Sequence, residues 1–176
     1  STHNNKIVDI LVDGGRIAEI KKNITARGGP RIIEGEGLCV SPGWIDLQAV
    51  SCDPGYEHRE TVDSMLKAAA AGGFTAVCVH SNNQPPLHAK SQIEYLLNRG
   101  NGRVTQLIPF GTVTLDGAGK DLAEMFDMKQ SGAAAFSDYK HPIADAGTLL
   151  RALQYASGIN AVVCAHCNDI TISRGG

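Results

Sequence analysis

The feature that most constrains the fold of this chain is the regular alternation of β-prone and helix-prone segments after residue 42. Short apolar runs alternate with stretches whose apolar side chains recur three or four positions apart, as in Val62, Met65, Leu66 and Ala69. The units repeat at intervals of roughly 25 to 35 residues, and connections of that length favour parallel strands joined by helices that cross over the sheet. The sequence therefore predicts the α/β class.

Five strands and four helices are predicted in this region. The strands span residues 44–47, 75–80, 103–110, 133–137 and 160–166, and the helices span 58–71, 88–98, 120–130 and 145–156. On architecture alone, five strands favour a doubly wound sheet, because a closed eight-stranded barrel typically needs ~250 residues. No G-x-G-x-x-G follows any predicted strand, so the sequence gives no support to a dinucleotide site.

The first 42 residues differ from the rest. Residues 7–20 hold two short β-rich runs joined through Asp13-Gly14, which is a strong hairpin signal. Further β-prone pieces at 31–34 and 38–40 end at Ser41-Pro42-Gly43. We expect residues 1–42 to belong to a small β unit and residues 43–176 to form the α/β unit.

Composition excludes several classes of protein. The 16 basic and 18 acidic side chains are dispersed, so we expect no nucleic-acid partner. The stretch 68–79 falls well short of the ~20 apolar residues of a membrane span, and residues 1–6 lack the layout of a signal peptide. We therefore expect no membrane association and a cytoplasmic location.

Cysteine usage argues against a disulfide framework. The five cysteines are an odd number, and three of them lie in strand-like runs. Cys164 and Cys167 form a C-x-x-C, but no second pair accompanies them and His166 lies between them. A buried strand end is the simpler interpretation of this pair than a zinc ribbon.

Several motifs at the predicted strand ends carry a specific resemblance. The chain contains Asp46, Pro54-Gly55, His58-Arg59-Glu60-Thr61 and Ala70-Ala71-Gly72-Gly73-Phe74-Thr75, in that order. From about Lys6 to its last residue, it resembles a dihydroorotase of the cyclic amidohydrolase superfamily. The resemblance implies a TIM-type (β/α) barrel of which residues 43–176 supply the first five β/α units. Residues 1–42 would then be part of a small β-sandwich domain.

The resemblance also implies that part of the site lies outside this sequence. A family member has eight barrel strands, so a His of the sixth strand and the catalytic Asp of the eighth would follow Gly176. We therefore expect the chain to be a fragment, and no residue in it is assigned as catalytic.

Within the part that is present, four family positions are degenerate. The two metal-binding His of the first strand align with Gln48 and Val50, and the Arg that would hold the substrate carboxylate aligns with Cys52. An amide is a poor zinc ligand, an isopropyl group is none, and a thiolate cannot replace a guanidinium on a carboxylate. The family also shows two adjacent acids after the fourth strand, where this chain has Asp138 followed by Tyr139.

Three family positions keep a usable side chain. Asn82 aligns with a substrate-binding Asn, although a turn-forming Asn before two prolines is an equal interpretation. Asp138 and His166 align with metal ligands, and a structural role for His166 is the alternative. A substitute metal site formed by His80, Cys52, Asp138 and His166 is conceivable, because all four lie at strand ends, but it is not favoured.

The remaining histidines call for simpler roles. His58, His88 and His141 lie at helix starts or in loops. We interpret them as solvated or capping residues.

The function implied by the family is the reversible, zinc-dependent ring opening of dihydroorotate to carbamoyl aspartate. Loss of two ligands and the Arg predicts a dihydroorotase-like protein of pyrimidine biosynthesis that is impaired or inactive and has a structural or partner-binding role. Zinc is the cofactor that the family implies, and the sequence leaves open whether this chain binds it. Aspartate transcarbamoylase is the partner that the resemblance suggests, together with homo-oligomerisation. The alternative is an active zinc-dependent hydrolase of dihydroorotate or of a related hydantoin-type or allantoin-type cyclic amide.

Overall fold

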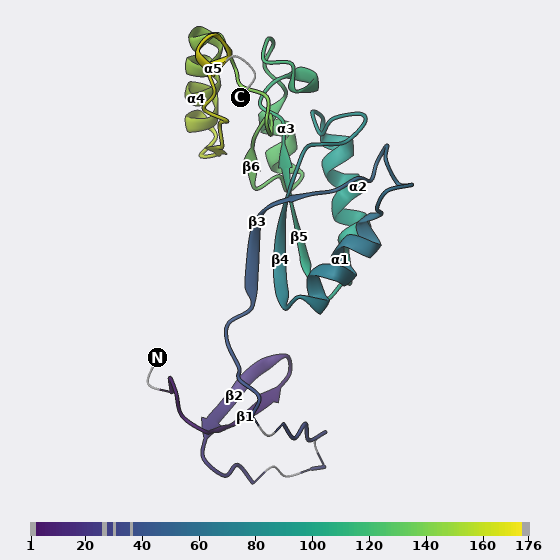
Figure 1. The fold of residues 1–176 in the computed structure, drawn as a ribbon, viewed down its shortest axis with the longest axis vertical. Helices are drawn as coiled ribbons and strands as arrows, with labels where there is room; N and C mark the ends of the chain where they lie inside the picture. The colour runs from purple at the N-terminus through teal and green to yellow at the C-terminus, as the bar shows by residue number, and fades with distance from the viewer. Residues whose placement is uncertain (1–2, 26–27, 30, 36, 174–176) are drawn as a thin grey trace. The chain divides into compact units, whose positions relative to one another are not determined.

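The structure is a computed structural model that describes residues 3–25, 28–29, 31–35 and 37–173. It divides into two compact units, Ser1–Ser41 and Pro42–Gly176 (Figure 1). In the first unit, β1 (Asp9–Asp13) and β2 (Arg16–Lys21) pair antiparallel, which confirms the predicted hairpin. The described residues of 31–34 and 38–40 form no strand, contrary to their β-prone composition.

The second unit is a parallel sheet with helices. Its strands are β3 (Trp44–Val50), β4 (Phe74–His80), β5 (Gln106–Gly111), β6 (Ala135–Phe136) and β7 (Val162–Val163), and each pairs parallel with the next. The helices are α1 (Val62–Ala71), α2 (Lys90–Gly100), α3 (Met125–Gln130), α4 (Ala146–Gly158) and α5 (Ile170–Ser173), with a 3₁₀ turn η1 (Leu115–Gly117).

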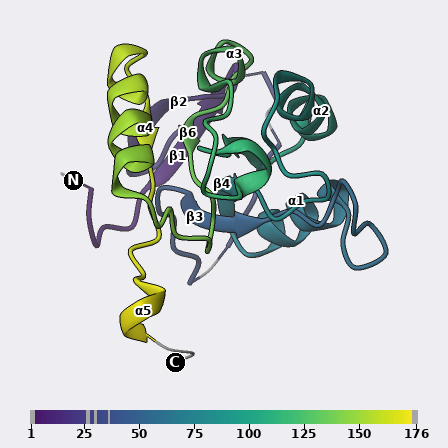
Figure 2. The same cartoon turned by 90° about the horizontal axis from the view of Figure 1, so that it is seen from above.

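The strand order decides between the two α/β architectures. A doubly wound sheet reverses direction at a switch point, whereas the strands here follow one another in sequence order, as the staves of a barrel do. Figure 2 shows α1 to α4 arranged around one side of the curled sheet. The doubly wound expectation was therefore wrong, and the partial TIM-type barrel implied by the family resemblance is confirmed.

Element boundaries differ from the predicted ones where tertiary contacts intervene. The helix predicted at 120–130 begins only at Met125, because Leu122 forms a β-bridge with Thr114 and the Ala123 amide donates to the Val113 carbonyl. The predicted strands at 133–137 and 160–166 shorten to two residues each. None of the described helices has the length and apolarity needed to cross a bilayer.

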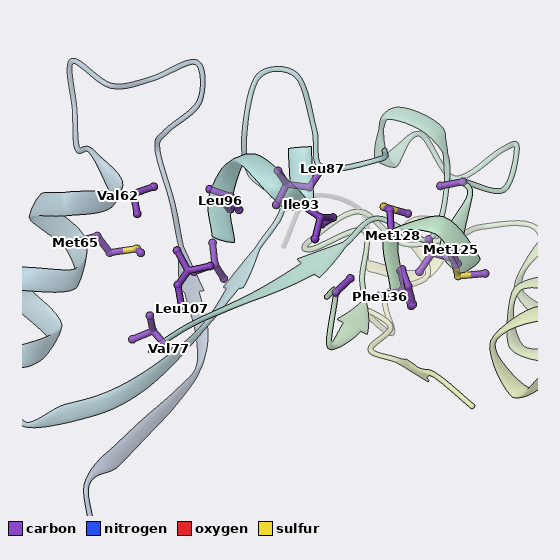
Figure 3. Close-up of a cluster of buried hydrophobic side chains, with 14 of the residues drawn as sticks. Val62, Met65, Val77, Leu87, Ile93, Leu96, Leu107, Met125, Met128 and Phe136 are labelled. Carbon is purple, nitrogen blue, oxygen red and sulfur yellow. The ribbon is translucent and has the colours of Figure 1, made fainter. Parts of the chain in front are cut away.

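The core lies between the sheet and the helices. Val77 of β4 is buried here with Met65 of α1 and Ile93 of α2 (Figure 3). Val79 of β4 belongs to the same cluster. Cys78, between Val77 and Val79 in β4, points to the opposite, concave face, since side chains alternate along a strand. There, Cys78, Phe110 and Ala135 form a second, smaller cluster. Burial raises the pKa of the Cys78 thiol, which therefore remains protonated and packs as an apolar group.

A buried carboxylate fastens the loop after β3 to the helix layer. Asp53 is fully buried, and its carboxylate accepts from the Tyr95 hydroxyl at 2.6 Å and from the Val62 amide at 3.3 Å. Arg99 Nη2 lies 3.5 Å from the same carboxylate. The contact joins the first turn of α1 to the exposed side of α2 and holds the loop over the end of the sheet.

The hydrogen bond from Tyr95 to Asp53 makes the free energy of unfolding depend on pH in the alkaline range. Bonding to Asp53, together with burial, raises the pKa of Tyr95 above its ordinary value of 10.0. The stabilising contribution is therefore fully present below pH 10.0 and lost as the pH rises through the higher pKa of the folded state.

Replacing the phenol tests this dependence. We expect Tyr95→Phe to lower the free energy of unfolding by about 1 kcal/mol at neutral pH. The difference from the unmodified protein should shrink as the pH rises above 10.0. Urea unfolding across this pH range measures it, with Tyr56→Phe as the control that spares the Asp53 contacts. A difference that persists unchanged at high pH would contradict the assignment.

Candidate functional site

The candidate site lies at the carboxyl ends of the parallel strands, where loops bring polar side chains together. Asp46, Gln48 and Val50 lie on β3, whose pairing with β4 shifts register between Asp46 and Ala49. Gln48 is exposed and Val50 is partly buried, while the Gln48 amide donates to the Asp46 carboxylate at 2.8 Å. Cys52 follows the strand as a free, partly buried thiol. Together with Cys52, β3 itself therefore offers one carboxylate, already bonded locally, and no imidazole.

Asp138 is engaged by the loop that follows β5. Its Oδ1 accepts from the amides of Val113 (2.8 Å) and Thr114 (3.0 Å), and its Oδ2 accepts from the Thr114 hydroxyl at 2.6 Å. The side chain is 5% exposed. A buried carboxylate with three donors is a structural anchor, and these bonds take three of its roughly four lone-pair sites.

An aromatic cluster lies beside Asp138 on the concave face. The His80 ring packs 4.7 Å from the Phe110 ring and 5.9 Å from the Tyr139 ring, measured between centroids. His80 Nε2 lies 3.1 Å from the Leu47 carbonyl oxygen, so the imidazole also bridges β4 to β3. Tyr139 has a φ of 57°, a left-handed conformation that Asp and Asn adopt far more readily than Tyr. The three rings therefore pack together on the concave face, from β4 and β5 to the residues that follow β6.

The donor set does not fit a zinc ion. Within the described parts of the chain, no group of three or more His, Cys, Asp or Glu side chains is positioned to hold a metal. His166 is exposed beyond the end of β7, where it lines a groove with Pro142 and Leu149. The conceivable substitute site of His80, Cys52, Asp138 and His166 is therefore not assembled by this structure.

The two asparagines that follow β4, Asn82 and Asn83, have different surroundings. Asn82 is exposed and lines a polar pocket, so its side chain is accessible to a ligand. Asn83 is 4% exposed, and its amide nitrogen donates to the carbonyls of Ser51 (3.1 Å) and Asp53 (2.9 Å). The turn-stabilising role that the sequence offered for Asn82 is filled by its neighbour.

Gly55 allows these two loops to meet. Its φ is +103°, and a Cβ there would lie 2.3 Å from the Gln84 carbonyl oxygen. The Pro-Gly pair of the family motif thus has a steric reason, because only Gly permits this approach.

The buried polar residues that hold the loops in place were not predicted from the sequence. Asp53, Asn83 and Thr114 carried no signal of burial in the sequence, apart from the Pro-Gly that follows Asp53. His88, interpreted as solvated or capping, instead lies with Nδ1 3.0 Å from the Asp116 carboxylate. His58 packs edge-on near Tyr56 with 6.4 Å between ring centroids.

The fold and the site together define the class of protein. It is a partial (β/α) barrel of the amidohydrolase type, with polar residues at the carboxyl ends of the strands. Residues 37–176 match the family described as Dihydro-orotase-like. The chain therefore belongs to the dihydro-orotase-like family, and the expected resemblance is confirmed.

Curated relatives agree with this assignment. The chain is 36% identical over 172 residues to the dihydroorotase of Geobacter metallireducens, covering 97% of this chain and 41% of that protein. It is 38% identical over 168 residues to the dihydroorotase of Pelotomaculum thermopropionicum, covering 96% of this chain and 39% of the relative. The dihydroorotase of Solibacter usitatus is 32% identical over 177 residues, with 100% and 41% covered. The chain thus spans about two fifths of the length of these relatives.

The structural role of Asp138 can be tested by removing its carboxylate. We expect Asp138→Ala to lower the free energy of unfolding by about 3 kcal/mol or more, because it leaves two amides and a hydroxyl buried without an acceptor. Thr114→Val should cost less, since it removes one of the three donors. Denaturant unfolding with and without a zinc chelator measures both effects.

The same measurement separates anchoring from metal binding. Asp127→Asn, on the exposed start of α3, is the matched control and should leave stability within about 0.5 kcal/mol. If the loss in Asp138→Ala appeared only in the presence of zinc, the anchoring role would be wrong.

Proposed function

We propose that this chain is part of a dihydroorotase-like protein of pyrimidine biosynthesis that no longer performs zinc-dependent catalysis and acts as a structural or partner-binding subunit. The observation that carries this proposal is the engagement of Asp138 by the β5 loop beside the His80–Phe110–Tyr139 cluster. Together with Gln48 and Val50 on β3, it leaves the concave face without a ligand set.

The chemistry of the family reaction explains why these losses matter. Opening a cyclic amide requires an activated water, and a bound zinc ion supplies it by lowering the pKa of that water toward ~7. The substrate carboxylate also requires a cationic anchor, and the aligned position holds the Cys52 thiol. The residues of this chain hold neither the activating group nor the anchor, so no step of the reaction can be derived from them.

Turnover decides between this proposal and its alternative. We expect the full-length protein, supplied with saturating zinc, to show no turnover of dihydroorotate. The hydantoin and allantoin ring systems serve as further substrates for the alternative, an active zinc-dependent cyclic amide hydrolase. Turnover of any of the three above the level of a chelated sample would overturn the loss of catalysis and favour the alternative.

Restoring ligands should reveal how far the site has changed. We expect the double variant Gln48→His, Val50→His to take up little zinc, because Tyr139 and His80 still occupy the concave face. Adding Tyr139→Asp supplies an acid and also suits the left-handed backbone at that position. Zinc content by metal analysis should therefore rise in the triple variant above the double variant.

The unmodified chain is the reference for that series. Stoichiometric zinc in the unmodified protein after dialysis would contradict the proposal, as would full zinc uptake by the double variant. Equal folding of all variants, checked by circular dichroism, excludes a trivial loss.

The partner follows the same proposal. Aspartate transcarbamoylase is the candidate, in a cytoplasmic assembly that also includes further copies of this protein. The exposed apolar side chains Phe126 of α3 and Leu150 and Leu153 of α4 support a protein-binding role, since a protein partner would cover such a surface. Stable co-purification with that enzyme is expected to survive chelation and to weaken in Leu150→Glu. Recovery of the protein without the enzyme under gentle lysis would argue against this partner.

A further inference from the structure

The turn that follows α2 places an asparagine directly before a glycine. Asn101 and Gly102 are the only Asn-Gly pair in the sequence. Both residues are exposed, and so are the next two, of which Val104 is 88% exposed. The turn leads into the amino end of β5, so it lies at the opposite end of the sheet from the candidate site.

Few contacts restrain this pair. Asn101 ends α2 with φ −64° and ψ 138°, and Gly102 has φ +71°. Apart from its chain neighbours, a Cβ built on Gly102 would meet nothing within 4 Å. Among the residues that the structure describes, none accepts a hydrogen bond from the Gly102 amide or bonds to the Asn101 side chain. The side-chain amide and the following backbone nitrogen are therefore both accessible.

This arrangement permits a reaction within the chain. The backbone nitrogen that follows an asparagine can attack the Cγ carbonyl carbon of that side chain, because the ring that forms is five-membered. A side chain on the following residue hinders the approach, and Gly102 has none. Rotation about the Cα–C bond of Asn101 brings the two atoms together, and the open surroundings of the turn allow this rotation.

Two other pairs of this kind are restrained by the fold. Gly117 follows Asp116, but the Gly117 amide donates to the Thr114 carbonyl at 3.0 Å. The amide that follows Asn160 donates to the Ala156 carbonyl at 2.8 Å. These nitrogens must give up a hydrogen bond before they can attack, whereas the Gly102 nitrogen has no such bond to a described residue.

We propose that Asn101 is a self-modification site that converts to aspartate and isoaspartate. The Gly102 nitrogen bonds to Asn101 Cγ and closes a succinimide ring, while the Cγ–Nδ2 bond breaks. Ammonia leaves with the proton that the Gly102 nitrogen gives up. Water then adds to either ring carbonyl and opens the ring, which returns a proton to the nitrogen and leaves a carboxyl group that ionises. Water is the only co-reactant, and the proposal does not depend on whether the family reaction has been lost.

The modified chain should remain folded. It carries one more negative charge than the unmodified chain, at the C-terminal end of α2, where the helix dipole disfavours an anion. Arg99 and Arg103 lie two residues before and two residues after this position, and both side chains are exposed. Their charges oppose the unfavourable effect of the dipole, so ion exchange should separate the modified form as a folded, more acidic species.

Incubation of the full-length protein at neutral pH tests the site. Peptide masses at successive times should show that the side-chain amide at residue 101 becomes a carboxyl group. We expect the rate in the folded protein to lie within about tenfold of the rate in a urea-denatured sample, because no large opening of the fold is needed. Asn160, in contrast, should convert only in the denatured sample. A slower folded rate at residue 101 would show that the fold protects the pair and would overturn the proposal.

Three variants locate the reaction. Asn101→Gln lengthens the side chain by one methylene, so the more acidic species should no longer form. Asn98→Gln, on the exposed side of α2, is the matched control and should leave its formation unchanged. Gly102→Ala should slow the reaction by about tenfold. Undiminished formation of the acidic species in Asn101→Gln would place the modification elsewhere and overturn the site. If Gly102→Ala lost its fold, the two Gln variants and the denatured reference would still decide the outcome.

Discussion

The structure depends on satisfying buried backbone donors at the carboxyl ends of its parallel strands. Loops that close over a sheet edge carry amides that have lost water, and each must find an acceptor. Two buried carboxylates do this here. Asp53 accepts from the start of α1 and from the Tyr95 hydroxyl of α2, and Asp138 accepts from the loop that follows β5. The loops of the candidate site are thereby held from two sides.

This anchoring holds the loops of the candidate site without any contribution from a metal. In (β/α) barrel enzymes, the loops at this end of the barrel carry the active site. In this chain the architectural contacts are made by Asp53, Asn83 and Asp138, none of which needs a metal. Gln48 and Val50, which the family resemblance aligns with metal ligands, make none of these bonds, so the identity of their side chains does not decide how the loops are held.

Rings at the concave face add a second constraint. His80 packs on Phe110 and Tyr139 and bridges to β3 through the Leu47 carbonyl. Such packing stabilises the sheet on its concave face. The rings therefore fix the packing of this face independently of the side chains at Gln48 and Val50.

The sequence by itself determined the α/β class, the hairpin near Gly14, the approximate positions of four helices and the family. These follow from local patterns: apolar periodicity, turn residues and motifs in a fixed order. Tertiary structure alone decided the sequential strand order, the late start of α3, and which side chains at the strand ends are anchors. The sequence shows that residue 138 is an aspartate. It does not show that the three hydrogen-bond donors to its carboxylate come from Val113 and Thr114, 25 and 24 positions away. Such long-range partners, like the opposite roles of Asn82 and Asn83, are set by packing, which no local pattern records.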